Sequence, residues 1–561
     1  MPNKPVNLMR WLLVSAVSAA AQMAGAATAS SGNQNPIDRA DPSVVERELE
    51  DPKRDAEQRE RPRPELKRDD VPSPAAIMGS VQATSIMIEG ATALRPEAFE
   101  SATRPFVGRP LNAADLRALA GSVADVARGA GYGLATAWIP QQVVERGVLR
   151  VQIEEGRIDG IEISGSAAAV VKPVLAPLVT GTPIKTAELE RRLLLASDLY
   201  GVWVGKARLR RVNRQNILVV DTHREPATGR ISLDNWGSST VGPIRLNLGT
   251  DLHGLLSAED RLSIGGVITP LEPREYALIR GKYIKGLGTN GTEISLAGYA
   301  ARSRAGGALR DLAFEGESSE GAVAVSQALL RSRTASLWAD LELTVRDAEQ
   351  SRRGIRIRDD RLSVLRASTY VSAKVGGGRA RARLALAQGL DIFDTTEAND
   401  PLRSRFDGSG IFSKAEFWAH YDRTLGGSLS LQLEAEGQIA SRPLLSSEEM
   451  GLGGRYFLRG YDYREFAGDK GIAGSVELRF DLRIGGPVKA AQLYGYADAG
   501  AVGNLGQGRV GGSLASAGGG IRALLEPRLE GSLEIGVPLR KGFDEDRDLD
   551  TRLSFVLTSR F

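Results

Sequence analysis

The feature that most constrains this chain is an alternation of apolar and polar residues that recurs between residues 226 and 561. In GSLSLQLEAEGQIA (427–440), leucine, alanine and isoleucine fall on one side, and serine, glutamine and glutamate fall on the other. ISLDNWG, EISLAGYA, SLWADLELTV and RARLALAQGL repeat the pattern. Because successive side chains of a β-strand point to opposite faces, each segment predicts a strand with one apolar and one polar face.

Two architectures share this alternation, a soluble β-sandwich and a membrane-spanning β-barrel. Charges in mid-strand on the polar faces suit a water-filled lumen, and a repeat of about 20 residues fits strands of about 10 residues plus loops. The final strand, TRLSFVLTSRF, ends in an aromatic residue and has one apolar face, formed by Leu553, Phe555, Leu557 and Phe561. We therefore expect residues 226–561 to form a transmembrane antiparallel β-barrel of about 16 strands.

The first residues predict export from the cytoplasm. Lys4 and Arg10 are followed by an apolar stretch from Trp11 to about Ala21 and then by small residues. This pattern is typical of a cleavable signal peptide, which we assign to residues 1–29. A membrane anchor helix fits less well because the apolar stretch is short, and no later stretch reaches the roughly 20 apolar residues of a spanning helix.

Residues 30–79 are rich in charges of both signs and contain no aromatic residue. Asp41 could cap a solvated helix from Pro42 to about Arg61, and the prolines beyond it favour an extended linker. A disordered tether is an equal alternative. We expect a charged helix and linker, and the helix is a candidate plug for the barrel.

Residues 80–225 predict two small α+β units. In the first, residues 80–157, the strand SIMIE precedes a helix, and VLRVQIEEGRI follows as a second strand. The apolar residues at helical spacing in that helix are Leu111, Leu116, Leu119, Val123 and Val126. The second unit, residues 158–225, repeats the order with IDGIEISGS, the amphipathic helix TAELERRLLLASDLYG and two further strands. The repetition predicts a tandem of similar domains.

Composition excludes several classes of function. A net charge of +3 does not resemble the basic footprint of a nucleic-acid binder, so we expect no nucleic-acid partner. The absence of cysteine rules out disulfides and thiolate chemistry, and the three histidines are too scattered to hold a metal. Neither a nucleophile elbow nor a phosphate loop occurs. We expect no catalytic residues, no cofactor and no metal, and hence no enzyme.

One segment, RYFLRGYDYREFAGDKG (455–471), interrupts the strand pattern with charges and aromatics. Together with GIAGSVELRF after it, YADAG at 496–500 and the domain order, it resembles the TpsB transporters of two-partner secretion. That group is the ShlB/FhaC/HecB haemolysin secretion/activation family within the POTRA and outer-membrane barrel superfamily. The resemblance covers essentially the whole chain after the signal peptide, and it implies that the two small units are POTRA domains.

The resemblance implies that a loop at about residues 446–472, after the eleventh strand, folds back into the lumen. Its tip would be Arg459, Gly460 and Tyr461, and the wall motif would be Tyr496, Asp498 and Gly500, with Arg459 paired to Asp498. Tyr496 departs from the family's usual phenylalanine, and its hydroxyl needs a partner. Glu477 could be a second partner for Arg459 or a solvated pore residue.

The residues support this pairing independently of the family. Alternation through QLYGYADAG places Tyr494, Tyr496 and Asp498 on one face, which is the lumen face if the opposite face meets lipid. A carboxylate there requires a cation, and the planar fork of arginine can donate two hydrogen bonds to it.

The resemblance implies an outer-membrane transporter with periplasmic POTRA domains. These would capture an unfolded exoprotein of the TpsA type, an adhesin, haemolysin or toxin, for export through the pore of a monomer embedded in lipid. A client groove in the second POTRA domain would be lined by Leu189, Leu193, Leu194 and Leu199, although a leucine stripe at helical spacing is more often core. The alternatives are a barrel-assembly factor of the same superfamily and a passive porin.

Overall fold

The computed structural model describes residues 36–49, 59, 66–68, 81–212, 215–238, 240–486, 488–506, 511–526, 528–542 and 550–561. The predicted signal peptide and much of the predicted linker lie outside the described residues. The chain folds into two compact units. Of the described residues, one unit comprises 36–49, 59, 226–329 and 334–561, and the other comprises 66–68, 81–225 and 330–333, each with the gaps given above.

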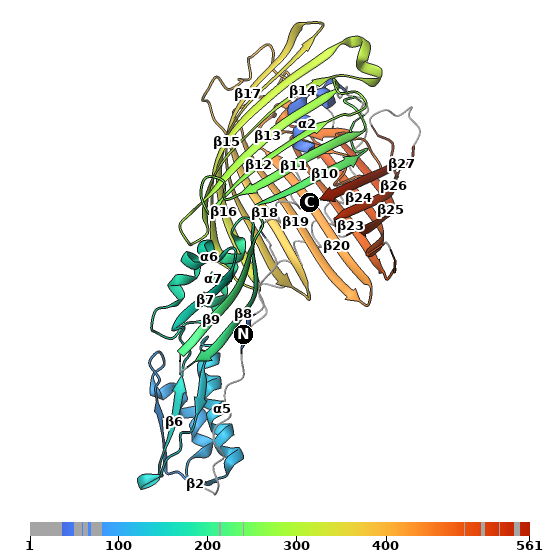
Figure 1. Ribbon diagram of the computed structural model, residues 1–561. Helices are drawn as coiled ribbons and strands as arrows, with labels where there is room; N and C mark the ends of the chain where they lie inside the picture. The colour runs from blue at the N-terminus through green and yellow to red at the C-terminus, as the bar shows by residue number, and fades with distance from the viewer. Residues whose placement is uncertain are drawn as a thin grey trace. The chain divides into compact units, whose positions relative to one another are not determined.

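The larger unit is a closed barrel of sixteen strands, which confirms the predicted architecture (Figure 1). The strands in barrel order are β10 (Ala227–Asp234), β11 (Arg245–His253), β12 (Asp260–Ile268), β13 (Tyr276–Leu287), β14 (Thr292–Arg304), β15 (Phe314–Arg331), β16 (Ala335–Arg352), β17 (Ile355–Val375), β18 (Gly378–Gly389), β19 (Ser413–Gly426), β20 (Leu429–Ala440), β23 (Lys470–Leu482), β24 (Ala490–Gly503), β25 (Gly512–Glu526), β26 (Leu529–Pro538) and β27 (Arg552–Arg560). The ring closes where β10 pairs antiparallel with β27 through five residue pairs, Arg230–Asp234 with Val556–Arg560.

The two faces of the wall follow the alternation in the sequence. Along β27, Leu553 and Leu557 are 62 % and 42 % exposed on the outer face, whereas Ser554 and Thr558 are buried on the inner face. Large apolar side chains are likewise exposed on many other barrel strands. Such an outer surface is unfavourable in water and is typical of contact with lipid.

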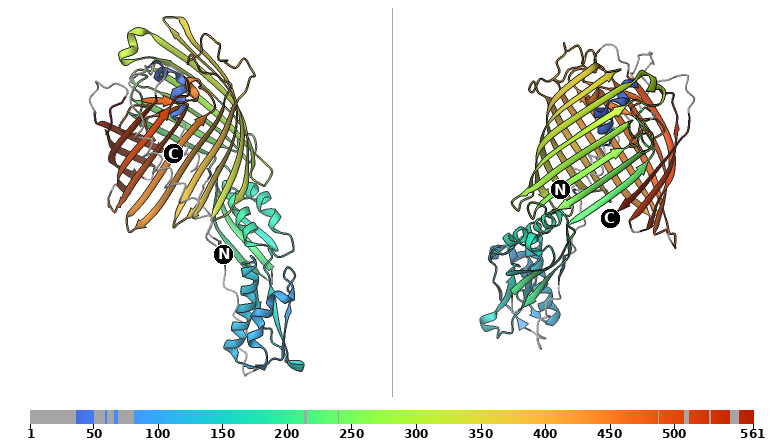
Figure 2. Two further views of the ribbon diagram at one scale, coloured as in Figure 1. Left: turned by 180° about the vertical axis from the view of Figure 1, so that it is seen from behind. Right: turned by 45° about the horizontal axis from the view of Figure 1, so that its top comes forward.

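A short helix, α2 (Pro42–Leu49), lies within the ring of barrel strands, where it is drawn in blue in each view of Figure 2. Asp41 caps it, because the Asp41 carboxylate accepts hydrogen bonds from the Ser43 N–H and hydroxyl at 2.9 and 2.6 Å. The prediction of a solvated helix was wrong for this part, since Val44 and Val45 are buried. The reason is that the apolar face of α2 packs against the barrel wall.

The first α+β domain of the smaller unit is a three-stranded sheet covered by one long helix. Strand β6 (Val148–Glu154) is central, parallel to β3 (Ser85–Glu89) and antiparallel to β5 (Thr136–Trp138). Helix α5 (Ala113–Gly129) begins at a capping box on Asn112 and buries Leu116, Leu119 and Val123, as predicted. The remaining elements here are β2 (Val81–Gln82), β4 (Pro110–Leu111) and α4 (Glu100–Thr103), with short 3-10 turns.

The second α+β domain has the strand order β1 (Leu66–Arg68), β8 (Val202–Val212), β9 (Gln215–Arg224) and β7 (Gly160–Gly165). Its helices are α6 (Ala168–Leu175) and α7 (Thr186–Asp198). Helix α6 was not predicted because its sequence, AAVVKPVL, has almost no polar face and contains a proline. In the part of the chain that the structure describes, no helix is both long and apolar enough to cross a membrane.

Glu155 ties a loop of the first domain to its sheet. The carboxylate is 2 % exposed and accepts hydrogen bonds from the backbone N–H groups of Thr92, Ala93 and Leu94 at 2.7, 2.7 and 2.9 Å. Burial alone would raise the pKa of Glu155, but these N–H groups outweigh it and hold the pKa below its ordinary value.

Replacing Glu155 with alanine should lower the free energy of unfolding of this domain by roughly 2–4 kcal/mol, because three N–H groups lose their acceptor. Since the pKa is lower in the folded state, the contribution is present above the unfolded pKa of about 4.3 and is lost as the pH falls through the folded value. Denaturation of residues 80–157 at pH 7 and at pH 3 measures both effects. Glu145→Ala, at an exposed position, is the control; equal stabilities of the two variants would contradict the assignment.

Candidate functional site

The segment that interrupts the strand pattern is the loop at residues 441–469, between β20 and β23, which are the eleventh and twelfth strands of the barrel. A short hairpin of β21 (Met450–Leu452) and β22 (Phe466–Gly468) closes its base. Leu452, Phe457 and Leu458 of the loop pack against Val502 and Leu514 on β24 and β25. The loop is therefore held against the lumen face of the wall.

Arg459 at the loop tip is buried against acidic side chains of the wall. Its Nε and Nη2 donate to the two carboxylate oxygens of Asp498, each at 3.0 Å, and its backbone N–H donates to the same carboxylate at 3.2 Å. Its Nη1 lies 2.9 Å from Glu477 and 3.4 Å from Glu534. The structure thus brings Arg459 and Asp498 together in a bidentate ion pair with further carboxylates around it.

Glu477 and Tyr496 complete the pocket that holds this guanidinium. Glu477 is 2 % exposed and bonded to Arg459, so it is a partner of the arginine and not a solvated pore residue. The Arg459 guanidinium lies 3.4 Å from the centre of the Tyr496 ring, where a cation–π contact is favourable. The Tyr496 hydroxyl, which replaces the hydrogen of a phenylalanine, donates to Glu534 at 3.3 Å.

Glycines let the loop backbone approach the wall. A Cβ on Gly460 would lie 2.9 Å from the Pro538 nitrogen and 3.0 Å from the Ser516 Cβ, closer than side chains normally pack. On the wall, a Cβ on Gly500 would meet Leu452 and Leu458 of the loop at 3.0 and 3.1 Å. Close contact with backbone therefore requires glycine at 460, whereas at 500 two leucine side chains would have to shift slightly.

Tyr461 anchors the far side of the tip. Its hydroxyl donates to the Ala515 carbonyl at 2.8 Å or the Arg540 carbonyl at 2.6 Å, and it accepts from the Arg540 N–H at 3.1 Å. Arg552 of β27 donates to the Tyr461 carbonyl at 2.6 Å. The tip therefore contacts β24, β25, β26 and β27, the last strands of the barrel.

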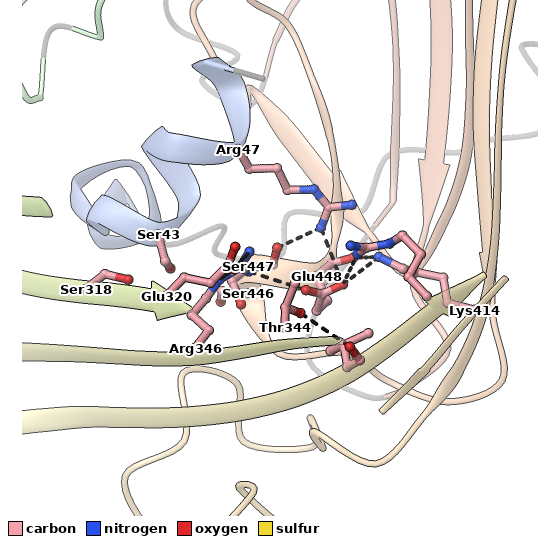
Figure 3. Close-up of polar contacts among 12 residues, drawn as sticks. Ser43, Arg47, Ser318, Glu320, Thr344, Arg346, Lys414, Ser446, Ser447 and Glu448 are labelled. Carbon is pink, nitrogen blue, oxygen red and sulfur yellow. Dashed lines mark hydrogen bonds and ion pairs between the residues drawn. The ribbon is translucent and has the colours of Figure 1, made fainter. Parts of the chain in front are cut away.

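Helix α2 and the base of the loop share a second charged cluster (Figure 3). Glu448 is 2 % exposed, and its carboxylate accepts from the ammonium of Lys414 on β19 at 2.7 Å. Arg346 on β16 lies 3.3 Å from the other oxygen of Glu448, and Arg47 of the helix lies 3.7 Å from the oxygen that Lys414 contacts. Arg47 also donates to the Ser447 carbonyl at 2.7 Å. One loop carboxylate therefore links helix, loop and wall.

Two further contacts fix the helix. Glu48 pairs with Arg245 on β11 at 3.2 Å, and Arg245 also pairs with Asp234 on β10 at 3.0 Å. The hydroxyl of Tyr463 in the loop donates to the Val44 carbonyl of the helix. The helix is thus bound both to the wall and to the loop.

A polar cavity of about 620 Å³ adjoins the loop tip inside the barrel. Its lining includes Arg459, Glu477 and Tyr494 beside Trp236 and Trp418. The lumen is therefore not filled completely by the loop and the helix.

The leucine groove predicted in the second α+β domain requires correction. Leu189, Leu193 and Leu194 of α7 are no more than 1 % exposed and belong to the domain core; only Leu199 is partly exposed. These side chains cannot contact a client because the helix packs them onto its own domain.

Sequence reasoning missed several residues that contact the site. They include Ser475, Glu534, Lys414, Arg346 and Glu448. Glu534 could have been found by the argument used for Asp498, because Leu533 and Ile535 on either side of it are exposed on the outer face.

Comparisons with known proteins agree with this fold. The family model of haemolysin secretion/activation proteins ShlB/FhaC/HecB matches residues 214–523, and the ShlB-type POTRA domain model matches residues 81–156. The chain is 21 % identical over 389 residues to the heme/hemopexin transporter protein HuxB of Haemophilus influenzae (strain 86-028NP), covering 68 % of each chain. It is 23 % identical over 371 residues to the outer membrane transporter CdiB of Dickeya dadantii, covering 62 % of this chain and 63 % of CdiB.

Among solved structures, CdiB from Escherichia coli matches with a TM-score of 0.75 at 19 % identity and covers 95 % of this chain and 100 % of CdiB. CdiB from Acinetobacter baumannii matches with a TM-score of 0.66 at 15 % identity, covering 94 % of this chain and 100 % of that chain. The chain therefore has the fold of these proteins.

Gly460→Ala should displace the loop tip, because the added methyl group would meet the backbone of β26 and not a flexible side-chain end. We expect hydrogen exchange of the amides at 458–461 to rise about tenfold or more, which corresponds to a loss of at least about 1.4 kcal/mol in local stability. Gly485→Ala is the matched control, since a Cβ there would meet nothing within 4 Å. Unchanged exchange in Gly460→Ala would refute the close contact.

Proposed function

This chain belongs to the haemolysin secretion/activation family ShlB/FhaC/HecB, and we propose that it exports a TpsA-type partner protein in unfolded form through its barrel. It is a β-barrel transporter of the outer membrane that acts in two-partner secretion, and its POTRA domains are periplasmic. The main support for the proposal is the buried ion pair of Arg459 with Asp498, which holds a long loop inside the lumen beside a polar cavity.

The route of the partner follows from the architecture. An extended chain can add as a strand to the exposed edge of a POTRA sheet, where recognition depends mainly on the backbone. It then passes through the polar lumen. Because the sequence contains no nucleotide-binding motif, we propose that folding of the partner outside the cell drives export.

In the resting state, loop 441–469 and helix α2 occupy the lumen and act as its plug. The contacts that support this role are mostly ion pairs and hydrogen bonds, such as those of Arg47 with Glu448 and Glu416. Arg47 remains partly exposed in these pairs, so water and the arriving partner can replace its contacts and the plug can leave. The barrel wall, held by continuous strand pairing, stays intact.

We propose further that the protein acts as a monomer in outer-membrane lipid and has no catalytic activity of its own. The even, closed strand ring supports the monomer because it leaves no barrel edge to be completed by a second copy. Family membership in a group of secretion transporters, together with the absence of a catalytic motif from the sequence, supports the lack of catalysis.

Loss of either member of the ion pair should impair export without preventing insertion. In cells that carry the transporter and its partner, Arg459→Ala and Asp498→Ala should each reduce the secreted partner about tenfold. Arg459→Ala leaves the Asp498 carboxylate buried without its cation, and Asp498→Ala removes the bidentate contact that holds the loop tip. Heat-modifiable migration of the barrel reports insertion, and Arg302→Ala, at an exposed position of β14, is the control. Normal export by both variants would contradict the role of the pair.

The same cells separate the rival functions. A barrel-assembly factor would change the amounts of other outer-membrane proteins when it is deleted, whereas an exporter would change only its partner. A passive porin would conduct at all times in a planar bilayer and would need no partner.

The plug should bind more weakly as the pH rises. Burial raises the pKa of Glu48 to about 7 although Arg245 opposes the change, whereas in the undocked helix the pKa is near its ordinary value of about 4.3. Between about pH 4.3 and pH 7, docking of the helix is therefore coupled to proton uptake by Glu48. The stabilisation of the docked helix that this uptake provides is lost as the pH rises through 7. In planar bilayers we expect several-fold more frequent opening at pH 8 than at pH 6, and Glu48→Gln should reduce that difference. If the opening frequency changed equally with pH in the wild-type chain and in Glu48→Gln, Glu48 would not be the group responsible.

A further inference from the structure

Arg59 lies in a socket of the barrel wall that is separate from the loop tip. Its Nη2 donates to the Asp340 carboxylate at 2.9 Å. Its guanidinium carbon lies 5.9 Å from the centre of the Trp338 ring and 5.7 Å from the centre of the Tyr370 ring. These three wall residues, Trp338, Asp340 and Tyr370, make up what we call the guanidinium socket.

The strand register builds the socket without any loop. Trp338 on β16 faces Tyr370 on β17, and Asp340, one inward position further along β16, faces Ser368. The two rings lie 5.6 Å apart and are tilted by 52°. Ser368 donates to Asp340 at 3.4 Å and so helps to fix the carboxylate. The arrangement is rigid because every member is on a paired strand.

The socket matches the chemistry of an arginine side chain. A guanidinium can contact aromatic faces and donate to a carboxylate at the same time, because it is planar and weakly hydrated. An ammonium group is a compact, strongly hydrated charge and suits such a site less well. Trp338 and Tyr370 are only 7 % and 4 % exposed, yet the Arg59 side chain is 30 % exposed, so the site opens toward the lumen.

We propose that the guanidinium socket binds arginine side chains of the exported partner during passage, and that Arg59 fills it as an internal ligand in the resting chain. The inference rests on the proposed export function, and it names a transit site and its ligand. When Arg59 leaves, the Asp340 carboxylate stands beside two aromatic rings in the lumen and requires a new cation. An extended chain in the lumen can offer one at each arginine that passes.

This role differs from that of the Arg459 pocket. Arg459 contacts three carboxylates and is almost completely buried, so a passing chain cannot replace it without removing the whole loop tip. Arg59 contacts one carboxylate at a partly exposed position and can exchange. The Arg459 pocket therefore holds the plug, and the guanidinium socket binds the partner.

Single-channel recording of the purified full-length chain with Arg59→Ala tests the socket. The probes are three ten-residue glycine–serine peptides that carry one central arginine, lysine or citrulline, added on the POTRA side of the bilayer. Citrulline keeps the planar shape of arginine but has no charge. We expect the arginine peptide to block the current about tenfold longer than the citrulline peptide, with lysine between them.

Asp340→Asn in the Arg59→Ala background should remove this difference, and it keeps the size and shape of the side chain. In the wild-type chain, where Arg59 competes, the arginine peptide should block less often than in Arg59→Ala. Equal block times for the arginine and citrulline peptides in Arg59→Ala, or a difference that survives Asp340→Asn, would overturn the proposal. Failure to export any partner by the wild-type chain in cells would instead refute the export function, whatever the peptides do.

Discussion

The bidentate pair between Arg459 and Asp498 is the interaction on which the interior of this barrel depends. A carboxylate on the lumen wall, surrounded by tyrosines and further acids, is unfavourable unless a cation reaches it. The loop supplies that cation, and the glycine at 460 lets its backbone come close enough to do so. The rest of the loop then follows, with its apolar residues against β24 and β25 and its polar residues against the helix.

The wall and its contents are stabilised by different kinds of contact. The wall is a closed ladder of backbone hydrogen bonds with an apolar exterior. A strand that left it would expose unpaired backbone groups to lipid, which is unfavourable. The helix and loop are held by side-chain contacts, among them the ion pair of Arg47 with Glu448 and the apolar packing of Val45, which can be lost without breaking a strand pair. A transporter needs this division, because the pore must empty while the cylinder that surrounds it remains intact.

Sequence reasoning succeeded where the signal was periodic or motif-like. Alternation predicted the sixteen strands and placed Asp498 on an inner face, and the Arg-Gly-Tyr triplet pointed to the loop. For the leucines of α7 it left a client groove open beside the more frequent core stripe, and burial decides for the core; helical spacing shows that one face is buried but not what buries it. The charged segment after Asp41 also misled, since a sequence rich in charge still contributed Val45 to a core.

The sequence by itself determined the class of the molecule: a strand period of two repeated along 336 residues, with charges in mid-strand and an aromatic last residue, favours a closed barrel in lipid over a soluble sandwich. Apart from the pair of Arg459 with Asp498, which the family resemblance implied, only the tertiary structure decided which charges meet. Arg459 reaches Glu534 across 75 residues of chain, Arg47 reaches Glu416 across 369, and Arg59 reaches Asp340 across 281. Such pairs have no local signature, because their partners become neighbours only once the ring has closed and its register has been set.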